Sequence, residues 1–155
     1  MKHYLILFFL LFISLTIYSE ELEVSGLGDV CVIPFHSTSG DTYTADVVTL
    51  YLRNALLYTG NVLYDTPYVL KAMDWKGIKK GDSVSIEQAI EIGKKLEAEV
   101  LYFGDVKKDG KAYTIHLTKI KLPMGEVIFE KTKIANDLYL ISRKIDEMLG
   151  ISPES

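Results

Sequence analysis

The chain has 155 residues, of which 48% are hydrophobic and 25% are charged, and its formal net charge at pH 7 is −4. This length fits one domain with a single core, and the composition excludes a disordered chain, a collagen-like chain, a disulfide scaffold and a polytopic membrane protein. A mildly acidic chain also lacks the basic face that nucleic-acid binding requires, so we expect no nucleic-acid partner.

The first 19 residues predict a secretory signal peptide. Lys2 gives a basic tip, and residues 4–18 are apolar except for Ser14 and Thr16. Because this run is shorter than the ~20 residues that span a bilayer, we expect export with cleavage after Ser19. A retained membrane anchor is the alternative, and it is the only membrane contact we expect. The predicted location is the periplasm or cell envelope.

Cys31 is the single cysteine of the chain, so no internal disulfide can form. One interpretation is a lipid-modified lipoprotein cysteine. However, Asp29 and the distance from Ser19 do not fit such a cleavage site. The other interpretation is a buried thiol in an apolar strand, where cysteine behaves as a small hydrophobe. We favour the buried thiol and identify no lipoprotein cysteine.

The first half of the mature chain predicts a βαβ unit. Residues 30–35 form a short apolar run that contains Pro34, as expected for a buried strand. Apolar residues at helical spacing follow over 42–59, and Gly60 suits a helix end. Residues 61–65 predict a second strand. The short links imply parallel pairing with a right-handed crossover.

The second half predicts two helices, an antiparallel meander and a final helix. These elements are, in chain order, a short helix from Thr66-Pro67, a loop over 75–82, a helix after the capping box Ser85–Gln88, a strand over 100–108, a hairpin turn at Asp109-Gly110, a strand around 113–118, a turn over 123–125, a strand over 126–134, and a helix from Asn136 to Gly150.

The expected fold class is α/β. We predict a single domain with a mixed sheet of about five strands, in which the βαβ unit precedes the other helices, the antiparallel meander and the C-terminal helix. The expected boundaries are a signal peptide over 1–19, an N-terminal extension over 20–29, the α/β domain over 30–150 and a tail over 151–155.

The order of these pieces resembles the TolB amino-terminal domain and its relatives. The likeness rests on Val32-Ile33-Pro34-Phe35 before Ser39-Gly40-Asp41, on the helix and strand from Ile86 to Val106, and on the turns at Lys108-Asp109-Gly110 and Met124-Gly125. The relatives include the curli-secretion channel subunit and the outer-membrane lipoprotein activators of penicillin-binding proteins. The resemblance implies a non-enzymatic envelope domain that works through protein contacts. It does not imply translocation, a pore or a lipid tether, because no propeller, long amphipathic hairpin or lipoprotein cysteine is identified.

A loop after the first predicted strand is the candidate ligand site. His36 lies at the carboxyl end of that strand, where open α/β sheets place ligand crevices. With Ser37, Ser39 and Asp41 beside a helix amino terminus, it could hold an anion. The alternative, which we favour, is that serine, glycine and aspartate only shape the turn and cap the helix.

Other chemistry has weak support in the sequence. No metal-ligand pair has the usual spacing, and no nucleophile elbow or phosphate-binding loop is present. We expect His116 on the polar face of a strand, with no second histidine joining His36. The prediction is a non-enzymatic envelope adaptor or accessory protein without cofactor or metal, whose partners are envelope proteins. The alternative is a periplasmic small-ligand or anion-binding protein that uses the His36–Asp41 loop. Self-association is left open.

Overall fold

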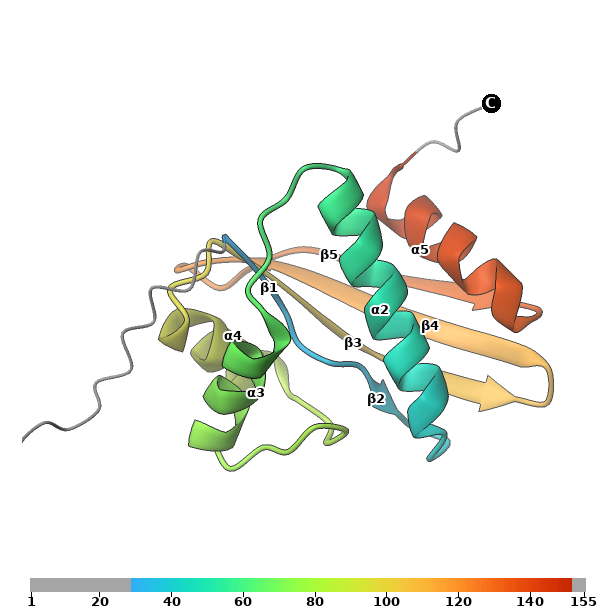
Figure 1. The fold of residues 1–155 in the computed structure, drawn as a ribbon, viewed down its shortest axis with the longest axis horizontal. Coiled ribbons are helices and arrows are strands. Elements are labelled where there is room, and N and C mark those ends of the chain that lie inside the picture. Colours follow the sequence, from blue (N-terminus) through green and yellow to red (C-terminus); the bar gives the residue numbers. More distant parts are fainter. Residues whose placement is uncertain (1–28, 152–155) are drawn as a thin grey trace, which may run out of the picture.

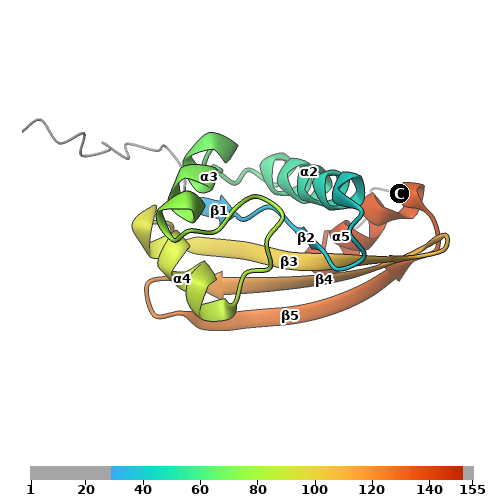
Figure 2. The ribbon, with the colours of Figure 1, turned by 90° about the horizontal axis from the view of Figure 1, so that it is seen from below.

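The computed structural model describes residues 29–151, where a five-stranded sheet carries helices on both faces (Figures 1 and 2). This confirms the predicted single α/β domain with a mixed sheet. The expected signal peptide, the extension up to residue 28 and residues 152–155 of the tail lie outside the described residues.

The long strand β3 (Val100–Asp109) organises the sheet. Strands β1 (Val30–Val32) and β2 (His36–Ser37) both pair parallel with it along one side. On its other side, β4 (Ala112–Lys121) and then β5 (Glu126–Ala135) continue the sheet antiparallel. Residues distant in sequence, from the start and the middle of the domain, therefore meet on β3.

The prediction of one strand over 30–35, followed by a loop from His36, is wrong in detail. Pro34 has no N–H to donate to a ladder, and the N–H of Phe35 donates to Thr49 Oγ1 at 2.9 Å rather than to β3. Pairing then resumes as β2, with His36 opposite Asp105. The loop therefore starts after Ser37.

The second strand expected over 61–65 is also wrong, since only a single parallel bridge joins Leu63 to Val30. Within it, Tyr64 N donates to Val30 O at 3.0 Å. Asp65 is already the N-cap residue of helix α3 (Thr66–Trp75). The segment after Leu63 is therefore too short to form a longer ladder with β1. The parallel partner of β1 is β3 instead.

Local signals predicted the helices well. Helix α2 (Thr42–Tyr58) begins after Asp41, and helix α4 (Ile86–Lys95) has the full capping box, with Gln88 N donating to Ser85 Oγ at 3.2 Å and Ser85 N donating to Gln88 Oε1 at 2.9 Å. The final helix α5 (Ile141–Leu149) ends at Gly150, whose φ of 76° is left-handed.

Two predicted boundaries move by a few residues. Asp109 pairs with Ala112, so the hairpin turn comprises Gly110 and Lys111 rather than Asp109 and Gly110. The C-terminal helix does not start at Asn136, because a short 3₁₀ turn, η1 (Leu138–Leu140), precedes α5.

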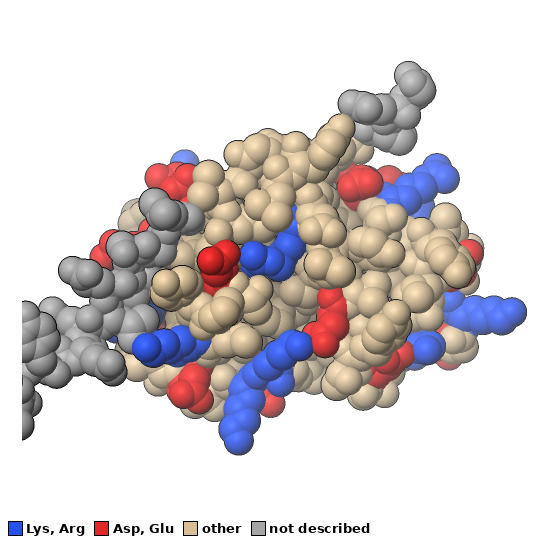
Figure 3. All heavy atoms as spheres, in the orientation of Figure 1, with Lys and Arg blue, Asp and Glu red and all other residues tan. Residues whose placement is uncertain are grey.

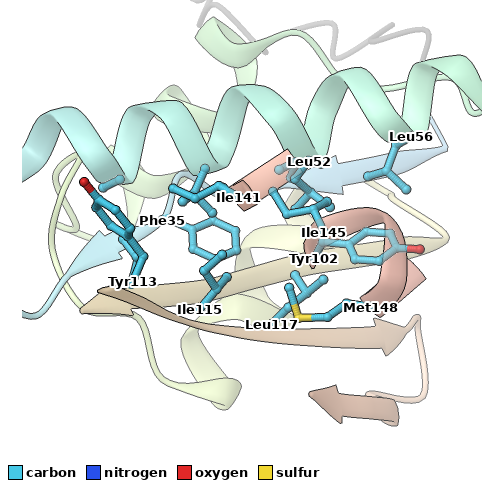
Figure 4. Packing of buried hydrophobic residues seen from close by; sticks show 14 of the residues in the cluster. Phe35, Leu52, Leu56, Tyr102, Tyr113, Ile115, Leu117, Ile141, Ile145 and Met148 are labelled. Carbon is cyan, nitrogen blue, oxygen red and sulfur yellow. The ribbon is translucent and has the colours of Figure 1, made fainter. Parts of the chain in front are cut away.

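One hydrophobic cluster joins α2 and α5 to one face of the sheet (Figure 4). Because alternate residues of a strand face opposite sides, this face receives Tyr102 and Val106 of β3. The labelled members in Figure 4 are Phe35, Leu52, Leu56, Tyr102, Tyr113, Ile115, Leu117, Ile141, Ile145 and Met148.

A second cluster joins α3 and α4 to the opposite face, around Leu101 and Phe103 of β3. At Gly93 of α4, a β-carbon would press against the side chain of Leu122, which agrees with the predicted close packing of this helix on the sheet. Figure 1 shows α3 and α4 near one end of the sheet and α2 and α5 towards the other. Among residues 29–151, no helix is both long and apolar enough to cross a bilayer.

Candidate functional site

The candidate loop connects β2 to α2, and Asp41 caps the helix. Its Oδ1 accepts a hydrogen bond from Thr44 N at 3.2 Å, and its Oδ2 accepts from Thr44 Oγ1 at 2.8 Å. Lys108 Nζ also donates to Oδ2, at 3.1 Å. The donations from the Thr44 hydroxyl and the Lys108 ammonium hold the pKa of Asp41 below its ordinary value. This carboxylate is therefore committed to the fold.

Ser37 at the end of β2 and Ser39 in the loop are also engaged by protein groups. Ser39 Oγ accepts a hydrogen bond from Lys108 N at 3.1 Å and lies 3.3 Å from Ser37 Oγ. These contacts fix the loop against the end of β3. The geometry is that of a helix cap and turn, and a ligand-binding role for the four predicted residues stays a prediction.

His36 is attached to a different segment. Its Nδ1 lies 2.6 Å from the carbonyl oxygen of Gly81, in the loop after α3. A carbonyl oxygen only accepts, so Nδ1 carries the proton in this contact. In the neutral imidazole, Nε2 is then left as the acceptor. His36 therefore combines a fixed ring orientation with one available acceptor.

A hollow of about 400 Å³ lies on one side of His36, between β2, the start of α2 and the loop after α3. His36 and Ser37 line it, whereas Ser39 and Asp41 are not among its lining residues. Its rim includes the ion pair between Lys80 Nζ and Asp46 Oδ1, at 2.8 Å. The four predicted loop residues are thus not brought together around one cavity.

A second hollow, of about 260 Å³, lies against the sheet and the start of α4. Here the strand register aligns three side chains, since His36 of β2 is opposite Asp105 of β3, and Asp105 is opposite His116 of β4. His116 Nδ1 lies 3.6 Å from Asp105 Oδ2. Contrary to the expectation for His116, a second histidine does share a hollow with His36.

Thr118 of β4 and Glu130 of β5, which lie opposite each other in the sheet, also line this hollow. Gly104 of β3 also lines this hollow, and the backbone of β4 packs closely against it, since a β-carbon there would overlap the carbonyl oxygen of His116. Two imidazoles and two carboxylates therefore line this hollow. In the part of the chain that the structure describes, no three His, Cys, Asp or Glu side chains are arranged to hold a metal ion.

Cys31 has the environment expected of a structural thiol. It is fully buried in β1, and burial raises its pKa to about 12. Such a thiol is neutral at physiological pH and does not act as a nucleophile.

An exposed aromatic residue lies away from both hollows. Trp75, the single tryptophan of the chain, is 58% exposed at the end of α3. The Nζ atoms of Lys76 and Lys95 lie 5.1 Å and 5.2 Å from its ring centroid. Lys76 also pairs with Glu91 of α4. From the sequence, Trp75 was predicted to begin the loop over 75–82, whereas in the structure it is the last residue of α3. Neither its exposure nor its contact with α4 was predicted.

Comparison with solved structures shows the same fold in several bacterial proteins. The C-terminal domain of LpoB from Escherichia coli superposes with a TM-score of 0.56 at 20% identity, covering 80% of this chain and 92% of that one. Lipoprotein GNA1162 from Neisseria meningitidis gives a TM-score of 0.59 at 11% identity, covering 81% and 98%.

TolB from Acinetobacter baumannii gives a TM-score of 0.52 at 9% identity, covering 80% of this chain and 28% of that one. Neither a protein-family model nor a curated protein matches the sequence. The chain therefore has the TolB-like α/β fold expected from its sequence, and at these identities the likeness concerns the fold alone.

Proposed function

We propose that this chain is an exported, non-catalytic cell-envelope domain that acts as an adaptor or accessory protein through contacts with envelope proteins. The predicted signal peptide supports export. The fold that it shares with LpoB, with a lipoprotein and with TolB supports the compartment and the absence of an enzymatic role.

The observation that carries this proposal is the exposure of Trp75. Tryptophan dominates binding energy at many protein interfaces, because its large side chain gains most from being covered by a partner. In this chain, the single tryptophan is 58% exposed at the end of α3, and the ammonium groups of Lys76 and of Lys95 in α4 lie over its ring. Its position is thus ordered before any partner binds, which lowers the entropy cost of association.

The experiment compares partner recovery by the full chain with and without this side chain. After cross-linking in the native envelope, an affinity-tagged wild-type chain should recover specific envelope proteins, and Trp75→Ala should reduce that recovery about tenfold or more. Tyr139→Ala is a matched control, since Tyr139 is an aromatic residue with 87% exposure on η1. Equal recovery by all three chains would contradict the proposed contact.

A second candidate function is small-ligand or anion binding beside His36. It is favoured by one observation, namely that His36 lines both hollows and retains Nε2 as an acceptor. The test is nuclear magnetic resonance titration of the full chain with phosphate, acetate and a primary amine. Saturable shifts at His36 and His116 that His36→Gln abolishes would support it, and no shift at millimolar concentration would contradict it.

A further inference from the structure

Helix α2 presents a second apolar surface, on a different helix from α3, which ends at Trp75 (Figure 1). Its outward face exposes Tyr43 at 66%, Leu50 at 56% and Leu57 at 51%. In the space-filling view of the same orientation, the surface over α2 is mainly uncharged (Figure 3). A helix of 17 residues whose inner side is already buried therefore carries an additional apolar stripe.

The stripe has the spacing of a helix-packing seam. Its members are separated alternately by four and three residues: Tyr43, Val47, Leu50, Asn54 and Leu57. This is the repeat by which one helix presents a continuous edge to another helix. An asparagine within such a seam is a known means of fixing the register of the two helices. The pattern favours a helical occupant over an extended strand.

Two charged residues on one flank of the seam indicate that the partner helix is the α2 helix of a second copy of this chain. Asp46 and Arg53 are seven residues, or about two turns, apart on the same side of α2. When a second α2 packs antiparallel about a twofold axis beside Leu50, Asp46 of each copy lies opposite Arg53 of the other. Tyr43 of each copy then meets Leu57 of the other. The surface is thus complementary to itself in charge and in apolar contacts.

Within one copy, each of these two charged side chains also has a contact of its own. Asp46 pairs with Lys80, and Arg53 Nη1 donates to Tyr64 O at 3.1 Å. We propose that two copies of this chain associate through antiparallel packing of their α2 helices, with Leu50 at the twofold axis. This surface differs from the one around Trp75, so the inference does not depend on the proposed function.

The first test is disulfide trapping in the purified full chain. Leu50→Cys places two thiols together at the axis, within the separation a disulfide can bridge. Mild oxidation should convert most of this variant to a covalent dimer. Met124→Cys is the control, since Met124 is 87% exposed on the turn between β4 and β5. Cys31 is fully buried in both variants and does not compete. No more dimer from Leu50→Cys than from Met124→Cys would overturn the proposal.

The second test uses charge reversal, which distinguishes a self-complementary pair from an unrelated helical partner. Asp46→Arg makes both facing positions basic, and Arg53→Asp makes both acidic. Sedimentation velocity should show that each variant alone associates at least about tenfold more weakly than the wild type. An equimolar mixture restores both ion pairs and should associate almost as strongly as the wild type. A mixture that stays as monomeric as its components, or a wild-type chain that is monomeric throughout, would overturn the antiparallel pair.

Discussion

The ammonium of Lys95 lies over the ring of Trp75, 5.2 Å from its centroid, and so connects the last turn of α4 to the end of α3. The loop after α3 and almost all of α4 lie between these two residues in the sequence, and only the tertiary fold brings them together. This contact orders the exposed indole. The proposed role of Trp75 as a binding anchor depends on that order.

Replacing Lys95 should therefore loosen the indole without unfolding the domain. Lys95→Ala removes one cation–π contact, worth about 0.5–1 kcal/mol at an exposed site. We expect faster quenching of Trp75 fluorescence by acrylamide and lower fluorescence anisotropy. The signal is specific, because the chain has one tryptophan. Lys94→Ala, at the preceding exposed lysine, serves as the control, and equal quenching of both variants would contradict the contact.

The cap at Asp41 should make a measurable, pH-dependent contribution to stability. Asp41→Ala removes the N-cap of α2 and should lower the free energy of unfolding by about 1 kcal/mol at pH 7. The pKa of Asp41 is lowered in the folded protein, mainly by the Thr44 hydroxyl and then by Lys108. Its charge-dependent contribution is thus fully present above the unfolded pKa of about 3.9 and is lost as pH falls through the lower folded value.

Urea unfolding at pH 7 and at pH 3 checks both statements. The difference between wild type and Asp41→Ala should shrink at the lower pH. Asp41→Asn keeps a capping oxygen without the charge, so its stability should lie between the two and depend less on pH. A difference between wild type and Asp41→Ala that is constant across this range would show that the carboxylate charge contributes nothing.

Gly104 should tolerate no side chain. A β-carbon there would overlap the carbonyl oxygen of His116 and approach Phe35, so the β3–β4 ladder would have to separate. We expect Gly104→Ala to lower the free energy of unfolding by about 3 kcal/mol or more. Gly77→Ala is the control, because Gly77 has a φ of +71° but open space around it, and it should cost only about 1 kcal/mol. Thermal unfolding by circular dichroism measures both losses.

Cys31 should be chemically silent in the native protein. Burial raises its pKa to about 12, and the side chain is fully covered. A thiol-reactive dye at pH 8 should therefore react only as fast as the domain unfolds, and it should react at once in denaturant. Rapid labelling of the native chain would show that β1 is accessible.

Sequence patterns correctly predicted the features that depend only on residues close in the sequence. The capping box at Ser85, the left-handed Gly150 and the buried thiol at Cys31 are local in this sense, and the structure confirms them. Pro34 also carried a local signal, since a residue without an N–H interrupts a ladder. Its consequence was missed, because the resumption of pairing at His36 depends on β3, which is distant in sequence.

The row of His36, Asp105 and His116 shows how a small error in register hides a site. The predicted turn at Asp109 and Gly110 would pair His116 with Phe103. The actual turn over Gly110 and Lys111 pairs His116 with Asp105. A shift of one residue in the turn moves every cross-strand neighbour, so the hollow beside His36 could not be assembled from the sequence.

The most direct test of the account is site-specific photo-cross-linking in living cells. A photoreactive phenylalanine analogue at position 75 of the full chain should give a discrete adduct with an envelope protein, identified by mass spectrometry. The same analogue at position 139, another exposed aromatic site, should not give that adduct. Trp75→Ala should also weaken co-purification of the identified protein. Adducts at position 75 that are absent, or no different from those at position 139, would contradict a protein contact centred on Trp75.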